Sequence, residues 1–178
     1  MINPTYEEVT KARELVRNIE IGHWLHHDLF SWQWWLLLVS AIIPWLIWIK
    51  FRDNDRTYEL LSFGFLWAIS AAILDSIGAE MLLWSYSTKL IPLAPPLLPA
   101  DFTIFPVFYM LIYQHAKNAY SHFLLSMIPA AIFSFIIEPL FIKADMFRLH
   151  NWSHTKSFFG FLILSNLVYL FFIRCIRR

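Results

Sequence analysis

Residues 58–84, YELLSFGFLWAISAAILDSIGAEMLLW, decide the fold class of this chain. The stretch is longer and more apolar than the roughly 20 residues that a helix needs to cross a bilayer. Its second half nevertheless contains two carboxylic acids, Asp75 and Glu80. Because a charged group is costly in hydrocarbon, acids in such a segment face the bundle interior and often mark a functional site.

The composition extends this interpretation to the whole chain. Of the 178 residues, 58% are hydrophobic, 19% are aromatic and 15% are charged, whereas about 25% of a typical soluble domain is charged. The aromatic side chains exceed what one soluble core could hide, so the bilayer is their natural solvent. The formal net charge of +1 does not indicate a nucleic-acid partner.

The apolar residues gather in long segments, which run at roughly 32–50, 58–84, 102–117, 119–142 and 157–175. All of them must be helical, because lipid offers no partner for an open strand edge. The third is short, and Asp101 precedes it in the position of a helix cap. The sequence therefore predicts an all-α polytopic membrane bundle over 31–178, with about five transmembrane helices. No internal repeat is apparent.

The first 30 residues form a separate unit. Residues 3–20 predict an amphipathic surface helix, in which Thr5 and Glu8 have the spacing of a capping box. A junction rich in Trp and His follows, as is typical of the headgroup zone. A second irregular stretch, at 91–100, is apolar but rich in proline, which excludes a helix. We expect this loop to lie at the interface, with a re-entrant segment as the alternative.

Basic residues give the orientation. One side of the predicted topology has Lys50, Arg52, Arg56, Lys117, Arg174, Arg177 and Arg178, and the other has Lys89, Lys143, Arg148 and Lys156. Because cytoplasmic loops are enriched in Lys and Arg, the sequence predicts a multi-pass protein of the cell membrane with a cytoplasmic C-terminus.

Four acids are the candidate catalytic residues: Asp75, Glu80, Asp101 and Glu138. Under this topology they converge at one end of the bundle. Asp75 is expected to lie deepest, about 13 Å in from Trp84 at 1.5 Å per residue. Each acid also has a structural interpretation. Asp75 could tie two helices together, Glu80 could be solvated, Asp101 could cap a helix, and Glu138 could mark the kink made by the following proline.

Aromatic residues are the candidate ligand-binding groups, because they could line a cavity beside these acids: Trp84, Tyr86, Tyr109, Tyr113, Phe135 and Trp152. The spacing of His23, His26 and His27 places them on one helical face, and His150 and His154 are similarly spaced. Such spacing can bind a metal, but no carboxylate or cysteine complements it. No metal and no cofactor are therefore expected.

Several motifs give the chain a family resemblance. FSWQWWLLL, IIPWLIWIK, LDSIGAEMLLWSY, LIPLAPPLLPADFTIFPVFYMLIYQ, FIIEPL and the dipeptide NW at 151–152 are similar to an uncharacterised family of small multi-span membrane proteins from Gram-positive spore-forming bacteria. The resemblance covers residues 30–152. It implies a helical membrane fold and brings no established activity. In general design, the chain also resembles compact membrane isomerases and terpene cyclases.

Three functions stay open. The first is an intramembrane pocket for a lipid or isoprenoid-like ligand, with acid–base chemistry on that ligand. The second is a proton or ion pathway, which five helices would need to build as a homo-oligomer. The third is a structural or assembly subunit in which the acids join helices. Membrane lipids are the expected partners in each case. Phosphate loops and common hydrolase and redox motifs are missing from the sequence.

Overall fold

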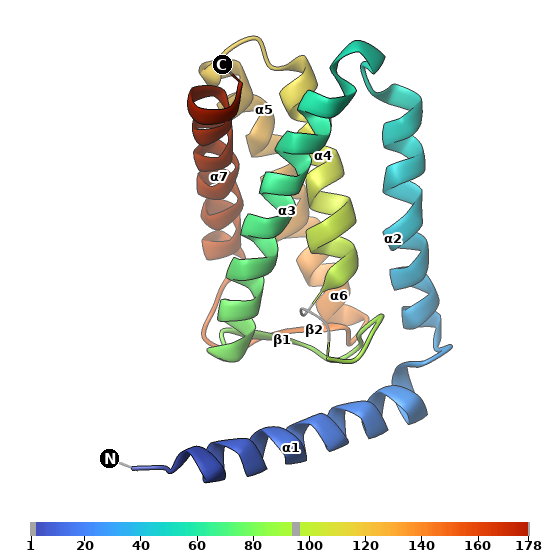
Figure 1. The fold of residues 1–178 in the computed structure, drawn as a ribbon. Coiled ribbons are helices and arrows are strands. Elements are labelled where there is room, and N and C mark those ends of the chain that lie inside the picture. Colours follow the sequence, from blue (N-terminus) through green and yellow to red (C-terminus); the bar gives the residue numbers. More distant parts are fainter. Residues whose placement is uncertain (1–2, 94–96, 178) are drawn as a thin grey trace.

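The computed structural model describes residues 3–93 and 97–177 and forms an all-α helical bundle, as the sequence predicts. Its α-helices are α1 (Tyr6–His23), α2 (Trp32–Phe51), α3 (Thr57–Glu80), α4 (Phe105–His115), α5 (Ala119–Ile132), α6 (Glu138–Lys143) and α7 (His154–Phe171). Wider π-helical turns cover Trp24–Asp28, Ala100–Ile104, Phe133–Ile137 and Phe172–Ile176, and a 3-10 turn covers Asn54–Arg56. In Figure 1 the long helices stand side by side, and the C-terminus lies at the end away from α1.

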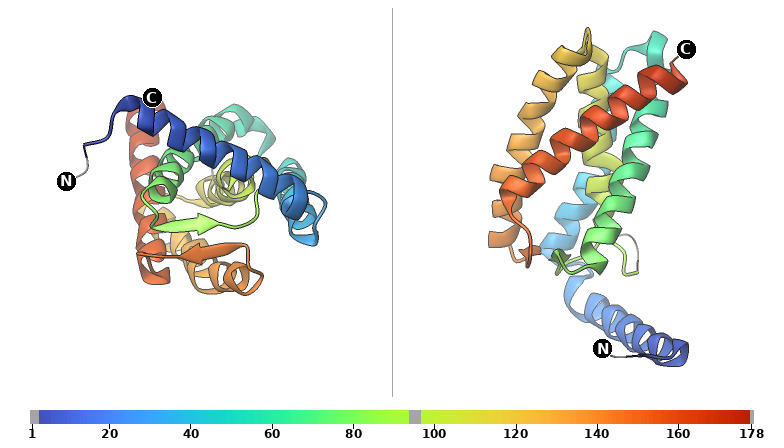
Figure 2. Two further views of the ribbon diagram at one scale, coloured as in Figure 1. Left: turned by 90° about the horizontal axis from the view of Figure 1, so that it is seen from below. Right: turned by 90° about the vertical axis from the view of Figure 1, so that its left-hand side faces the viewer.

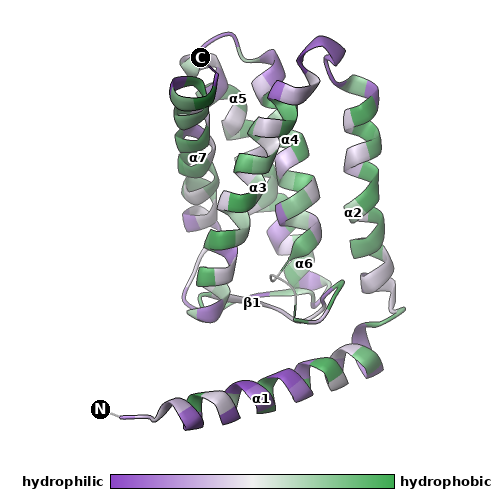
Figure 3. Ribbon diagram, viewed as in Figure 1, coloured by the Kyte–Doolittle hydropathy of each residue, from purple (hydrophilic) through white to green (hydrophobic). Residues whose placement is uncertain are grey.

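Within the described ranges, four helical rods are long and apolar enough to cross a membrane: Trp32–Phe51, Asn54–Glu80, Ala119–Lys143 and His154–Ile176. Figure 3 shows hydrophobic colour along these rods and hydrophilic colour at the turn between α2 and α3. The third predicted segment differs. Together with its π turn it runs from Ala100 to His115, which at 1.5 Å per residue is about 24 Å and is shorter than a hydrocarbon core of about 30 Å.

The helix α1 lies crosswise beneath one end of the bundle (Figures 1 and 2). The predicted capping box is confirmed, because the Thr5 side chain accepts from the backbone of Glu8 while the Glu8 side chain accepts from the backbone of Thr5. The apolar residues of α1 are exposed, with Leu15 at 61% and Ile19 at 60%. An ion pair of 2.9 Å between Lys89 Nζ and Glu20 Oε1 joins the end of this helix to the bundle.

A short antiparallel ladder closes the same end of the bundle. Strand β1 (Trp84–Tyr86) pairs with β2 (Phe147–Leu149), with Ser85 opposite Arg148. The prediction of one helical segment through Trp84 is wrong, because Trp84 lies in β1. The helix α3 ends at Glu80, and a residue at positive φ, Leu82 (φ 52°), turns the chain back. Asp75 therefore lies about 8 Å from the end of its helix, nearer to that end than the sequence predicted.

The turn after α3 recurs after α6. Leu83 N–H donates to Gly78 O and Leu82 N–H to Ala79 O. In the same pattern, Met146 N–H donates to Phe141 O and Asp145 N–H to Ile142 O. Asp145 also has positive φ (53°), like Leu82.

The backbone hydrogen bonds at the two ends of the β1–β2 ladder are also equivalent to each other. Ser87 N–H donates to Met146 O, and His150 N–H donates to Leu83 O. We therefore call the segment from α3 to α4 and the segment from α5 to α7 the two repeated units, since the turn and strand after α3 recur after α6. This repeat is not recognisable in the amino-acid sequence.

An aromatic core fills the bundle away from the ladder. Trp67 stacks on Tyr109 with ring centroids 4.4 Å apart, and Phe63 stacks on Tyr113 at 4.4 Å. Gly64 lets α3 approach α4, because a Cβ there would lie 2.5 Å from the Met110 sulfur. These contacts hold α3 and α4 together above the ladder end, where the interior is hollow.

Candidate functional site

A cavity of about 370 Å³ lies inside the bundle next to the ladder. Its wall comes from α3, β1, the π turn before α4, the α5–α6 rod, β2 and α7, and most of the lining residues are aliphatic or aromatic. Three of the four predicted acids line it: Asp75, Asp101 and Glu138. They come from three segments that are far apart in the sequence, and the two repeated units place them at one end of the bundle.

Asp75 is held by two donors from β1. Trp84 Nε1 donates to its Oδ1 at 2.7 Å, and Tyr86 Oη donates to the same oxygen at 2.8 Å. Burial raises the pKa of the Tyr86 hydroxyl well above its ordinary value, so this group stays a donor. Both bonds depend on the reversal of the chain after α3, because this reversal brings Trp84 and Tyr86 in β1 back to the last turns of the helix that contains Asp75.

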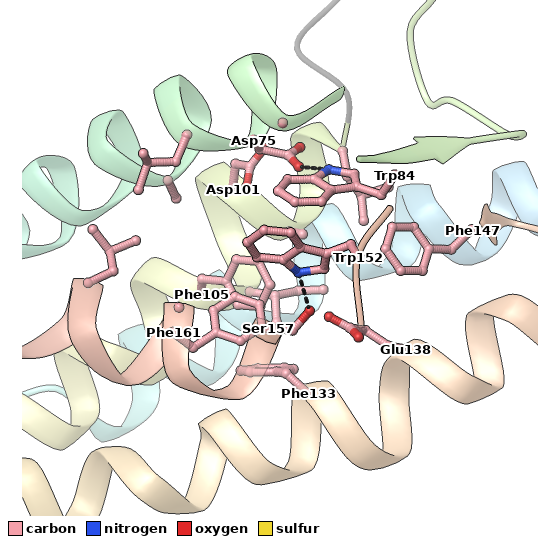
Figure 4. A pocket seen from close by; sticks show the side chains of 18 of the residues that line it. Asp75, Trp84, Asp101, Phe105, Phe133, Glu138, Phe147, Trp152, Ser157 and Phe161 are labelled. Atoms are coloured by element: carbon pink, nitrogen blue, oxygen red, sulfur yellow. Dashed lines mark hydrogen bonds between the residues drawn. The ribbon is translucent and has the colours of Figure 1, made fainter. Parts of the chain in front are cut away.

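Asp101 lies beside Asp75 in the cavity wall (Figure 4). Only 2% of its surface is exposed. It lies inside the π turn Ala100–Ile104, which has no side-chain cap, so the capping interpretation was wrong. The Oδ2 atoms of Asp75 and Asp101 have no protein donor. A buried acceptor without a donor is costly, and π turns often occur at functional sites.

Glu138 faces the cavity from the other repeated unit. It follows the π turn Phe133–Ile137, and Pro139 occupies the first turn of α6. His154 Nδ1 lies 2.7 Å from Glu138 Oε2, and the imidazole is partly exposed at the start of α7. Trp152 Nε1 donates to Ser157 Oγ at 3.1 Å, and Ser157 lies between Trp152 and Glu138 in Figure 4. The contact between His154 and Glu138 was not predicted from the sequence, because the rest of α6, a turn and strand β2 separate the two residues along the chain.

The indole rings of two lining residues lie between two sets of polar side chains in the cavity. Trp84 and Trp152 pack edge to face, with ring centroids 5.1 Å apart. Figure 4 shows the Asp75–Asp101 pair on the side of Trp84 and Glu138 with Ser157 on the side of Trp152. Among the described lining residues, none is Lys or Arg. The polar groups of the wall are therefore the three carboxyl groups, the hydroxyl groups of Tyr86 and Ser157, and the indole N–H donors.

The cavity opens sideways between α3 and α7. The exposed residues among its lining are Leu74 and Ile77 on α3 and Gly160 on α7. A Cβ built on Gly160 would meet nothing within 4 Å. Figure 2 shows α3 and α7 diverging toward the ladder end. Leu74 and Ile77 belong to a helical rod, Asn54–Glu80, that is long and apolar enough to cross a membrane.

Four predicted site residues lie outside the cavity. Glu80 is exposed at the end of α3. Tyr109 is buried behind Trp67, and Phe135 is 49% exposed on the outer face of its rod. Tyr113 lies at the opposite end of the bundle, where its hydroxyl donates to Glu59 at 2.5 Å. Of the predicted aromatic groups, Trp84, Tyr86 and Trp152 line the cavity.

The histidines do not assemble as their spacing suggests. His23 lies 3.4 Å from Asp28 and packs near His27. His150 bonds to Ser85, whereas His154 bonds to Glu138. A buried cluster that the sequence analysis missed joins α5 to α7, where His122 and Ser126 both lie within hydrogen-bonding distance of Ser165 Oγ. It is remote from the cavity wall and acts as a polar clamp between two helices.

Comparison of the chain with protein-family models, curated proteins and solved structures gives no match. The class is defined by the fold itself: the chain is an integral membrane protein of the all-α helical type.

Proposed function

We propose that this protein binds a hydrophobic small molecule, lipid-like or isoprenoid-like, in the cavity between its two repeated units. The observation that carries the proposal is the convergence of Asp75, Asp101 and Glu138 on one aromatic-lined cavity. Intramembrane acids are costly and mark functional sites, and an apolar cavity with a few convergent polar groups is a typical ligand site.

The sideways opening supports a ligand that arrives from the bilayer. Leu74, Ile77 and Gly160 border it, and all three lie on membrane-spanning rods. A molecule dissolved in the acyl chains could therefore enter without crossing water. The carboxyl groups would then meet its polar end, and one carboxyl could donate a proton while another accepts one.

A continuous proton or ion pathway has less support. The acids gather at one end of the bundle, and the interior beyond them is packed with Phe63, Trp67, Tyr109, Tyr113 and Phe172. Such packing excludes water from the other half of the bundle. The cavity is thus better suited to holding a ligand than to conducting ions.

Blocking the opening tests the binding proposal. We expect Gly160→Leu to fill the open space without a clash and to lower the amount of co-purifying small molecule about tenfold, measured by mass spectrometry of organic extracts. Gly22→Leu is the matched control, because a Cβ there also meets nothing within 4 Å and lies on α1. Equal ligand content in wild type and both variants would refute binding through this opening.

Replacing the acids tests whether their carboxyl groups contact the polar end of the ligand. Asp75→Asn and Glu138→Gln preserve side-chain shape while removing charge, so we expect folded protein that retains less ligand or converts it more slowly. If both variants unfold and no ligand is found with the wild type, the acids serve assembly of the bundle.

The proposed orientation places the C-terminus in the cytoplasm and the cavity near the outer surface of the cell membrane, following the distribution of basic residues. Cys175 is the one cysteine of the chain and is exposed. A membrane-impermeant maleimide should label it in inverted vesicles and not in intact cells. A variant with Cys175→Ser and Lys143→Cys should give the reverse result. Labelling of Cys175 from outside would invert the topology.

A further inference from the structure

The cavity wall has more unpartnered hydrogen-bond acceptors than unpartnered donors. Among the described lining residues, the buried side-chain polar atoms without a protein partner are Asp75 Oδ2, Asp101 Oδ2 and Trp67 Nε1. Two of these three are carboxyl oxygens, and Asp101 is 2% exposed. A bound molecule that carries N–H donors would satisfy these two carboxyl oxygens.

The described part of the cavity wall offers no counter-charge to an anionic head group. Asp75, Asp101 and Glu138 all line the cavity, and none of the described lining residues is Lys or Arg. A phosphate, diphosphate or carboxylate placed there would meet three acids and, among the described lining residues, no cation to balance its charge in a medium of low dielectric constant. Its lone pairs would also find few donors, because Trp84 Nε1 and Tyr86 Oη are already engaged by Asp75.

The same wall suits a cation. An ammonium group has three donors and no acceptor, which matches a site whose unmatched groups are mainly acceptors. The indole rings of Trp84 and Trp152 pack against each other beside the carboxyl pair. Indole faces attract cations, and more strongly where water is excluded. The remaining lining is apolar and could hold a hydrocarbon chain.

We infer that the cavity takes an amphiphilic amine, with its ammonium group at Asp75 and Asp101 on the Trp84 side of the indole pair and its hydrocarbon chain toward the opening at Gly160. This inference rests on the proposed function and specifies the head group of the ligand. It assigns Asp101 a direct contact with the ligand, and it leaves the Glu138–His154 pair on the far side of Trp152.

Three probes with one carbon skeleton test the head group: geranylamine, geraniol and geranate. Each is equilibrated by dialysis at pH 7 against the full-length protein in nanodiscs, and binding to empty nanodiscs is subtracted. We expect geranylamine to bind at least about tenfold more tightly than geranate, which corresponds to about 1.4 kcal/mol. Geraniol should fall between them.

Variants locate the contact. Asp101→Asn should weaken geranylamine binding about tenfold and leave geraniol binding within a factor of about two, which also shows that the variant is folded. Glu20→Gln is the control, because Glu20 is an acid of α1 outside this cavity, and it should change neither probe.

The outcomes separate the two proposals. Equal binding of geranylamine and geranate, or of geranylamine and geraniol, would overturn the amine inference while the hydrophobic cavity stands. Unchanged geranylamine binding in Asp101→Asn would do the same. Binding of none of the three probes would count against the proposed function itself, and the amine inference would fall with it.

Discussion

The two repeated units share a backbone plan and differ in the chemistry at corresponding places. Asp75 precedes the turn after α3, and Glu138 precedes the equivalent turn after α6. The first acid receives two hydrogen bonds from its own strand and lies beside a second acid. The second acid is paired with a partly exposed histidine from the following helix.

This difference shows how a repeated scaffold can build an asymmetric site. The turn geometry fixes where each acid lies, since the same backbone bonds recur in both units. The side chains that follow the turn decide what each acid contacts. Trp84 and Tyr86 are donors, while Phe147 and Leu149 in β2 offer none. The first unit thus presents a sheltered carboxyl pair, and the second presents a carboxyl group linked to solvent through an imidazole.

The largest expected effect comes from removing both donors of the first unit. Trp84→Phe combined with Tyr86→Phe leaves Asp75 Oδ1 without its two bonds, and we expect a loss of about 3 kcal/mol, because bonds to a buried charged group are strong and an unmet acceptor is costly. His154→Phe in the second unit should cost about 1 kcal/mol, since that pair is partly solvated. Thermal unfolding in detergent measures both. Equal losses would mean that the two acids are held alike.

A smaller effect concerns the close packing that distinguishes the first turn. A Cβ on Gly78 would lie 2.1 Å from the Trp84 ring, so Gly78→Ala should displace this ring and cost about 1–3 kcal/mol. The equivalent position in the second unit is Phe141, which is large. Gly160→Ala is the control, because its Cβ meets open space, and its stability should not fall. A stable Gly78→Ala variant with intact ligand binding would show that the position of Trp84 is unimportant.

The smallest effect concerns the left-handed residues of the two turns. Leu82→Gly should raise stability by about 0.5–1 kcal/mol, because a branched side chain is strained at positive φ. Asp145→Gly should change stability by less than about 0.5 kcal/mol, since Asp tolerates this conformation and its ion pair with Arg148 is exposed. Chemical unfolding curves of the two variants would resolve the difference. A larger gain at Asp145 would contradict the assignment of equivalent turns.

Much of the fold followed from local chemistry. The length and hydropathy of the apolar segments predicted a helical membrane bundle, and the spacing of Thr5 and Glu8 predicted the cap of α1. Both signals are contained within one helix. Three acids of the predicted site do line one cavity, because the number of apolar segments between them determined that they would reach the same end.

The errors came from contacts between segments. The end of α3 depends on the turn at Leu82 and on the pairing of β1 with β2, and neither partner strand has a distinctive pattern. Asp101 was interpreted as a cap because it precedes an apolar segment, whereas the π turn places it in the wall beside Asp75. Tyr109, Tyr113 and Phe135 are aromatic like the residues that do line the cavity, so the sequence does not distinguish them. Their positions outside the cavity depend on how the helices pack.

By itself, the sequence determined the solvent in which this chain folds, since the apolar content leaves a bilayer as the place where so many aromatic side chains are stable. It also determined that the acids must find shelter, because hydrocarbon gives them none. The tertiary structure alone decided which acids share a cavity, which donors hold them and where the cavity opens. Those properties depend on the return of the chain after α3 and α6 and on the divergence of α3 from α7, and each of these brings together residues that no local pattern connects.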